Sequence, residues 1–376
     1  VFPYFWHHDE NEKEVTVFRI YALTKDNKTV VLRVNDFTPY SYLELPTEID
    51  GNPIIWDSAK AQILTDAINN KRKTSAPIKT RFLYKKKLYY SQMDLKSNKE
   101  KMFPYLLLAF SSTQDRKFYS YAVHGKKYFA RGIGNVPCRV HEEDASAILQ
   151  FICHRKIPTA GWIEIKGKEI GKDERITLCD REFVVKWKDF KFSGGDDVPR
   201  PLICSMDIEV NSTNPNKMPD SDNPGDKIFQ ISCVLRREGS KSFQKFLLTL
   251  GNPDQKMTGR DVTIMRYKTE ADLLNGYAEF LQTEQPNIVT GYNILGFDIP
   301  YMIDRAKFNF VIDTFRQLGF PEYIGAEEKQ IKWSSAAYKV QNFKFLDAEG
   351  ILHVDLYPLV KRDYKFNKYK LKTVSE

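Results

Sequence analysis

The sequence predicts a mixed α/β protein with two domains, a β-rich N-terminal domain followed by a domain of alternating strands and helices. Its length of 376 residues exceeds that of one ordinary domain. Residues 14–45 alternate between apolar and polar side chains, whereas residues 202–308 switch repeatedly between strand and helix patterns. Between these regions, SGGDDVPR at 193–200 is rich in glycine, proline and charge. We therefore place the domain boundary between residues 198 and 199.

The N-terminal domain is expected to consist mostly of strands, with two helices. The alternation over 14–45 predicts a β-meander. Apolar residues recur at helical spacing over 57–71. Residues 71–101 are polar and highly charged, and we interpret them as a solvated excursion with one strand near 84–90. The other expected elements are strands at 102–110, 161–165 and 181–190 and a helix at 141–157.

The second domain is expected to contain a sheet covered by helices. An amphipathic helix is predicted at 270–283, because apolar residues share one face and Thr269 can cap the first turn. Residues 287–293 predict a short strand or turn, and a further helix is expected over 298–308. The expected strands of this domain lie at 202–210, 227–235, 243–250 and 263–267.

Composition narrows the class of protein without identifying it. A net charge of +8, with 57 basic residues, 20 Tyr and 25 Phe, suits a polyanionic partner, although a mixed surface over aromatic cores explains it equally well. No stretch reaches the ~20 apolar residues of a membrane span, and no signal-peptide pattern is present. Five cysteines without a CxxC pair predict free, mostly buried thiols in a reducing, intracellular compartment. The sequence does not begin with Met, and we expect it to be trimmed at both ends.

Two carboxylates interrupt the apolar strand predicted at 202–210. Its apolar residues predict burial on both faces, as in the middle of an α/β sheet. Asp207 and Glu209 are two residues apart, so on a strand their side chains point to the same face. Two like charges in a core are costly unless a positive group lies between them. The alternative is a strand end at which both side chains reach solvent.

A third carboxylate, Asp298, follows the segment NIVTGYNILGF and begins a predicted helix. It can act simply as a cap, because the start of a helix stabilises negative charge. It is also expected at the carboxyl edge of the sheet, where the sites of open α/β folds gather. Three convergent carboxylates without Cys or His ligands would suit Mg²⁺ or Mn²⁺ rather than zinc.

Several segments, in collinear order, resemble family B DNA polymerases, in particular the eukaryotic delta type and the polymerases of large DNA viruses. Asp207-x-Glu209 is similar to the first exonuclease motif of that family, and Asn293-x-x-x-Phe297-Asp298 is similar to the second. The stretch at 139–165 resembles the end of the family's N-terminal domain. The other similar segments are ISCVLRREG, YKTEADLLNGYAEFL and HVDLYPLVKRDYKFNKYKLKTVSE, and only 71–101 is not placed by the resemblance.

The resemblance implies a 3′→5′ proofreading exonuclease with a ribonuclease-H-like fold, which hydrolyses DNA phosphodiester bonds with two Mg²⁺ or Mn²⁺ ions. It implies that Asp207 bridges both ions, that Glu209 holds the first ion and that Asp298 serves the second. The positive ions would remove the repulsion that makes paired carboxylates costly.

The resemblance also implies contacts with the frayed primer end. Asn293 and Phe297, together with Tyr292, would bind it by hydrogen bonds and stacking, although Phe297 could equally be a core aromatic beneath the loop. The sequence KRDYKFNKYKLK at 361–372 interleaves cations with aromatics, which suits a DNA strand; a helix pair with a solvated face is the alternative. The cations expected to bind DNA here are Lys361, Arg362, Lys365 and Lys368.

The third exonuclease motif of the family, Tyr-x-x-x-Asp, is expected beyond residue 376, as are the polymerase domains. Asp355 precedes the expected place of that motif, and we interpret it as a helix-start residue. We therefore expect a piece of a polymerase with impaired nuclease activity. The partners implied for the whole enzyme are a single-stranded primer 3′ end, the template strand, and accessory subunits or a sliding clamp, in the nucleus or a viral replication compartment. Two alternatives stay open, a stand-alone 3′→5′ exonuclease and a non-catalytic DNA-binding module.

Overall fold

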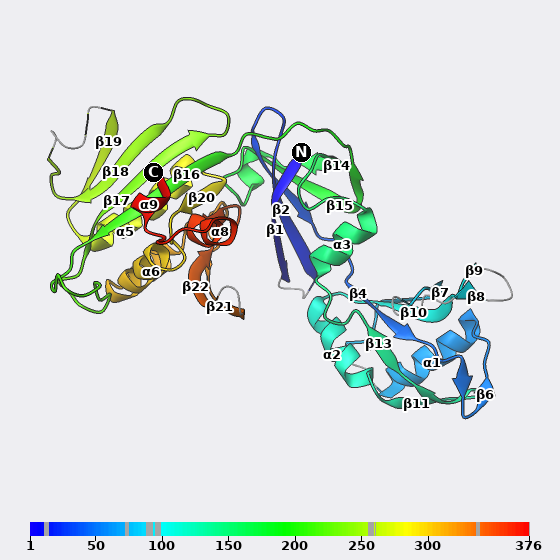
Figure 1. The fold of residues 1–376 in the computed structure, drawn as a ribbon. Helices are drawn as coiled ribbons and strands as arrows, with labels where there is room; N and C mark the ends of the chain where they lie inside the picture. Colours follow the sequence, from blue (N-terminus) through cyan, green and yellow to red (C-terminus); the bar gives the residue numbers. More distant parts are fainter. Residues whose placement is uncertain are drawn as a thin grey trace.

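The computed structural model describes residues 1–10, 15–71, 75–87, 93–94, 99–254, 259, 261–335 and 339–375. The chain folds into a mixed arrangement of strands and helices, as the sequence predicts (Figure 1). The described residues form three larger sheets. Two lie in the N-terminal half of the sequence, and the third begins at residue 202.

The first sheet has the strand order β1-β2-β3-β15-β14. Its strands are antiparallel except for β15, which runs parallel to β3. Helix α3 (Ala147–Arg155) packs against it, and a cluster of aromatic rings around Phe151 forms the core between them. The strands are β1 (Phe2–Glu10), β2 (Thr16–Leu23), β3 (Thr29–Val34), β14 (Ile163–Glu169) and β15 (Arg181–Phe192).

The second sheet, β13-β4-β10-β7, belongs to a lobe that extends away from the rest of the molecule (Figure 1). The lobe has its own apolar core, to which two helices and a two-stranded ribbon contribute. Its main elements are β4 (Tyr40–Glu44), α1 (Ser58–Lys71), β7 (Lys79–Lys85), β10 (Phe103–Ala109), α2 (Thr113–Val123), the ribbon of β11 (Lys127–Ala130) and β12 (Gly134–Pro137), and β13 (Arg139–His141). Short strands are β5 (Glu48–Ile49), β6 (Asn52–Pro53), β8 (Met93–Asp94) and β9 (Lys99–Glu100).

The third sheet has the strand order β19-β18-β17-β16-β20-β23. Its central strand β16 is antiparallel to β17 and parallel to β20. The carboxyl ends of β16 and β20 therefore lie at the same edge of the sheet. The strands are β16 (Leu202–Val210), β17 (Ile228–Arg237), β18 (Gln244–Leu250), β19 (Val262–Tyr267), β20 (Ile288–Gly291) and β23 (Leu352–Asp355). The remaining elements are α5 (Glu270–Glu284), α6 (Asp298–Phe308), α7 (Ile312–Phe315), the hairpin of β21 (Glu327–Ser335) and β22 (Lys339–Asp347), α8 (Leu356–Asp363) and α9 (Leu371–Ser375).

Four predictions about local structure need correction. The strand at 202–210 is buried on one face only, because Cys204, Met206 and Ile208 point inward while Asp207 and Glu209 on the opposite face are exposed. The predicted meander is wrong in its third strand, since β4 leaves β3 and joins the second sheet. The helix expected at 141–157 is shorter, and the strand expected near 84–90 ends at Lys85; residues 88–90 lie outside the described part.

The first and third sheets share one apolar core. Tyr21, Val31 and Cys179 of the N-terminal half pack in the same cluster as Met206 of β16. The five cysteines are free, and all except Cys153 are buried, as the sequence predicts. Among the described residues, no helix combines the length and apolarity that a membrane crossing requires.

Candidate functional site

Glycine allows the loop after β20 to approach the strand that carries the first carboxylate. A Cβ atom on Gly291 would lie 2.6 Å from the Met206 backbone oxygen and 2.4 Å from Cγ2 of Ile294. Real side chains do not tolerate such contacts, so the position requires glycine. The loop that begins here therefore lies directly beside Asp207.

Asp355 fixes the same loop from the other side. Its carboxylate accepts hydrogen bonds from the backbone N–H groups of Asn293 (2.8 Å) and Leu295 (3.0 Å), and from that of Tyr357 (2.9 Å) as the cap of α8. Asn293 adopts a left-handed backbone conformation with φ of 67°. The interpretation of Asp355 as a helix-start residue is confirmed. Its carboxylate also anchors the loop, which the sequence did not predict.

Asp207 and Asp298 are in contact, and both line the same pocket, which is described below. Asp298 is the first residue of α6, is only 3% exposed, and accepts a hydrogen bond from the Ile208 N–H at 3.2 Å. Burial, and then the nearby Asp207 charge, raise the pKa of Asp298 to about 7. Partial desolvation of the Asp207 carboxyl group also raises its pKa, although its hydrogen-bonding contact with Asp298 opposes that shift. Two carboxyl groups in such contact repel each other when both are ionised, so the arrangement favours a cation or a shared proton.

Glu209 lies on the same exposed face of β16, two residues beyond Asp207, and does not line the pocket. Within the described ranges, no group of three or more His, Cys, Asp or Glu side chains is arranged to hold a metal ion. The structure therefore brings Asp207 and Asp298 into contact and places Glu209 beside them on the same strand. The predicted convergence of all three around metal ions stays a prediction.

A pocket of about 490 Å³ opens in front of the Asp207–Asp298 pair. The three residues predicted to contact a primer end, Tyr292, Asn293 and Phe297, all line it. The Phe297 ring is partly buried against the core and lies 5.6 Å from the Tyr301 ring. Phe297 therefore fits both interpretations of the sequence, a core aromatic and a residue that could contact DNA, because it packs on the core and also lines the pocket.

The segment from α8 to α9 borders the pocket through residues other than the four predicted cations. Tyr357, Tyr369, Lys370 and Leu371 complete the lining, and the Tyr292 hydroxyl donates to the Tyr369 backbone oxygen at 2.7 Å. Three of the four lie within KRDYKFNKYKLK, so the interleaving of cations and aromatics already marked this segment. None of the four predicted cations lines the pocket: the Lys361 Nζ lies 5.4 Å from the Tyr357 ring centre, Arg362 pairs with Asp363, and Lys365 and Lys368 are exposed.

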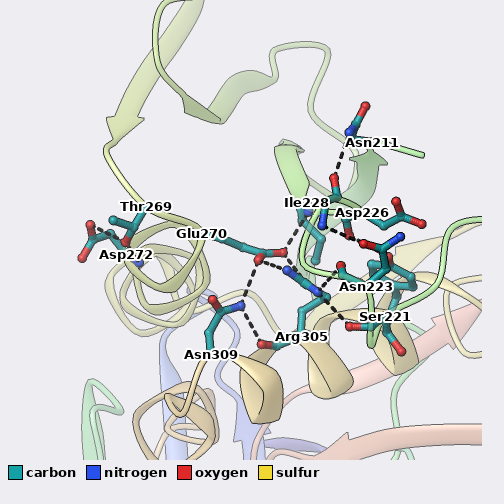
Figure 2. A network of polar contacts seen from close by, with 12 residues as sticks. Asn211, Ser221, Asn223, Asp226, Ile228, Thr269, Glu270, Asp272, Arg305 and Asn309 are labelled. Carbon is teal, nitrogen blue, oxygen red and sulfur yellow. Dashed lines mark hydrogen bonds and ion pairs between the residues drawn. The ribbon is translucent and has the colours of Figure 1, made fainter. Parts of the chain in front are cut away.

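A buried ion pair fixes the helix that carries Asp298. Figure 2 shows Arg305 of α6 and Glu270 of α5 in contact, and both side chains are almost fully buried. Glu270 also accepts from the Ile228 N–H at 2.9 Å and from Asn309 at 2.9 Å. Arg305 donates further to the backbone oxygens of Ser221 and Asn223. The network therefore ties α6 to α5, to the start of β17 and to the loop that follows β16.

Comparison with known proteins places this geometry in a family. The model of "DNA polymerase family B, exonuclease domain" matches residues 138–374. DNA polymerase 120R of Invertebrate iridescent virus 3 is 38% identical over an alignment that covers 100% of this chain and 33% of the relative. The DNA polymerase delta catalytic subunit of Plasmodium falciparum is 28% identical over an alignment that covers 98% of this chain and 33% of the relative. The chain thus spans about a third of the length of these relatives.

The fold agrees with a solved structure of the same family. The family B DNA polymerase from the hyperthermophilic archaeon Pyrobaculum calidifontis superposes with a TM-score of 0.60, at 16% identity, over 96% of this chain and 37% of that chain. At this identity the likeness concerns the fold, which agrees with the predicted ribonuclease-H-like arrangement. With the extent of the family match and the identity to viral polymerases, the chain belongs to DNA polymerase family B and carries its exonuclease domain.

Proposed function

We propose that this chain carries the 3′→5′ exonuclease of a DNA-directed DNA polymerase, which removes nucleotides from a frayed primer end by two-metal hydrolysis. The observation that carries the proposal is the contact between Asp207 and Asp298 at the end of a pocket lined by aromatic rings. A carboxylate pair with one buried member is costly in a purely structural role, and it is useful where cations bind.

The donor set fits hard divalent cations. Asp207 and Asp298 present carboxylate oxygens without nearby Cys or His ligands, which suits Mg²⁺ or Mn²⁺. We propose that Asp207 and Asp298 hold the ions together with Glu209, which lies on the same face of β16. When bound, two such ions supply an activated water and stabilise the leaving 3′ oxygen. A ligand from the Tyr-x-x-x-Asp motif would complete the set.

The other pocket residues have properties that suit a single-stranded 3′ end. The ring faces of Phe297 and Tyr292 can stack on unpaired bases, and the amide of Asn293 can hydrogen-bond to the terminal nucleotide. The left-handed backbone of Asn293, held by Asp355, fixes that amide before DNA binds. We propose that the phosphates of the strand bind the cations of the adjacent segment, which are the half-buried Lys361 and the exposed Arg362, Lys365 and Lys368.

In the whole protein we propose a role in DNA replication, with primer and template strands as partners. Accessory subunits or a sliding clamp, and a nuclear or viral replication compartment, would follow from that role. The relatives are named as DNA polymerases of viruses and as delta catalytic subunits, which supports this assignment.

The test is nucleotide release from a 3′-labelled single strand with Mg²⁺. We compare the 376-residue chain, a form extended through the Tyr-x-x-x-Asp motif, and Asp207→Ala in the extended form. We expect weak cleavage by the first, because one ion lacks a ligand, strong cleavage by the second, and none by the third. Exposed Asp313→Ala serves as a charge-matched control and should cleave normally.

The possible outcomes separate the alternatives. Robust and equal cleavage by the short and extended forms would favour a stand-alone exonuclease. Binding of single-stranded DNA without release from any form would favour a non-catalytic DNA-binding module and would overturn the proposed function.

A further inference from the structure

A long segment of the outer lobe contains no acidic residue. Between Arg116 and His141 the sequence has no Asp or Glu. Six Lys or Arg residues lie in these positions, so a large part of the chain's net charge of +8 is concentrated here. The six are Arg116, Lys117, Lys126, Lys127, Arg131 and Arg139.

The two-stranded ribbon places part of this charge on one face. In β11 and β12, Lys127 pairs with Pro137 and Phe129 pairs with Asn135, and all four side chains are exposed. The intervening residues, Tyr128 and Val136, are buried in the core of the lobe. Strand alternation therefore forces a cation and an aromatic ring onto the same outward face.

Phe129 is 60% exposed at the centre of this face. Arg131 is exposed in the turn that connects the two strands, and Arg139 is exposed just beyond β12. In the described part of the chain, Lys126, Lys127, Arg131 and Arg139 form no ion pair with an acidic side chain. Acidic side chains flank the ribbon: a Cβ atom on Gly134 would lie 3.7 Å from an Asp50 carboxylate oxygen, and Glu44 is opposite Arg139 across β4 and β13.

We propose that this ribbon face is a second binding site for single-stranded DNA. The cations would neutralise phosphates, and the Phe129 ring would stack on a base. An exposed ring in a cationic setting selects an unpaired strand, because a duplex offers no free base face. The absence of Asp and Glu from residues 116–141 gives the ribbon an excess of positive charge, which a polyanion requires.

The site is separate from the exonuclease pocket. Figure 1 shows the ribbon in the outer lobe, well apart from α8, α9 and β16 around the pocket. A strand that reaches the ribbon is therefore held at nucleotides distant from those at the Asp207–Asp298 pair. This second contact would add affinity without entering the hydrolytic step.

The test measures binding of a fluorescent oligothymidylate by anisotropy at several salt concentrations, with EDTA present to prevent cleavage. For Lys127→Gln/Arg131→Gln we expect affinity to fall about tenfold at low salt. The slope of log K against log salt should decrease by about 1.4, because each phosphate contact on a single strand contributes about 0.7. For Phe129→Leu we expect a loss of about fivefold or more with an unchanged slope, because stacking does not release counterions.

The matched control is Lys166→Gln/Lys168→Gln, which removes the same charge from two exposed positions of β14 near Glu164 and Glu169. It should leave both affinity and slope close to those of the unchanged chain. Equal effects of the ribbon and β14 variants would overturn the proposal, since only net charge would then matter. Equal losses of affinity for single-stranded and duplex probes would overturn it as well. So would an unchanged affinity in both ribbon variants, and an acidic protein surface would then be the better partner.

Discussion

Asp298→Asn should stabilise the metal-free protein at neutral pH. The pKa of Asp298 is about 7 in the folded chain, against an ordinary value of 3.8. A raised carboxyl pKa means that the folded state binds the proton more tightly than the unfolded state does. The contribution of this group to stability is therefore complete below about pH 4 and is lost as pH rises to about 7. Three pH units at ~1.4 kcal/mol each give a penalty of up to about 4 kcal/mol.

Asparagine is a suitable probe because its side-chain oxygen can still accept from the Ile208 N–H while carrying no charge. Urea unfolding in EDTA, at pH values between 4 and 8, measures the free energy of unfolding for both proteins. We expect the difference between Asp298→Asn and the unchanged chain to grow by ~1.4 kcal/mol per unit up to about pH 7 and then to level off. Exposed Asp313→Asn should show no such growth. A constant difference across this range would refute the reasoning.

Three further predictions concern the same site. Mg²⁺ should raise the melting temperature at pH 8 and should fail to do so in Asp207→Asn; at 100 times Kd the expected gain is about 2.7 kcal/mol, and an equal rise in both proteins would exclude this ion site. Asp355→Ala removes three backbone hydrogen bonds and should cost about 3 kcal/mol in urea unfolding, whereas a change below ~1 kcal/mol would show that the loop holds without it. Arg305→Met leaves Glu270 buried without its cation and should cost about 3–5 kcal/mol. The double variant with Glu270→Leu should recover most of that loss, and an additive double variant would contradict the pairing.

The elements that the sequence located well are those with strong periodicity and clear end signals. Strand β16 and helix α6 have the predicted bounds, and α5 differs by one residue at its end. The Thr269 side chain accepts from the Asp272 N–H, as the predicted cap requires. In these segments local propensity, apolar pattern and capping all favour the same secondary structure, and the tertiary contacts are consistent with it.

The sequence predicts the structure less well where contacts between distant segments determine it. The burial of one face of β16 depends on which neighbours cover the sheet, and a run of apolar residues does not contain that information. The strand that ends at Asp355 has four residues, and it pairs with β20, from which it is separated by more than sixty residues in the sequence. No local pattern therefore predicts this strand. Lys370 and Leu371 line the pocket because Tyr292 binds the backbone beside them, and that bond links distant segments.

The position of the site depends on both halves of the chain. Arg19 of the first sheet donates two hydrogen bonds, of 2.7 and 2.6 Å, to Glu349, which is 6% exposed in the turn before β23. The Tyr21 hydroxyl binds the same carboxylate at 3.0 Å. Strand β23 then runs directly from this turn to Asp355, which anchors the loop of Asn293. A boundary between residues 198 and 199 therefore separates two stretches of sequence, whereas the contacts that hold the pocket loop begin in the N-terminal sheet. Removal of that sheet would leave β23, and with it the loop beside Asp207, without the ion pair that fixes its start.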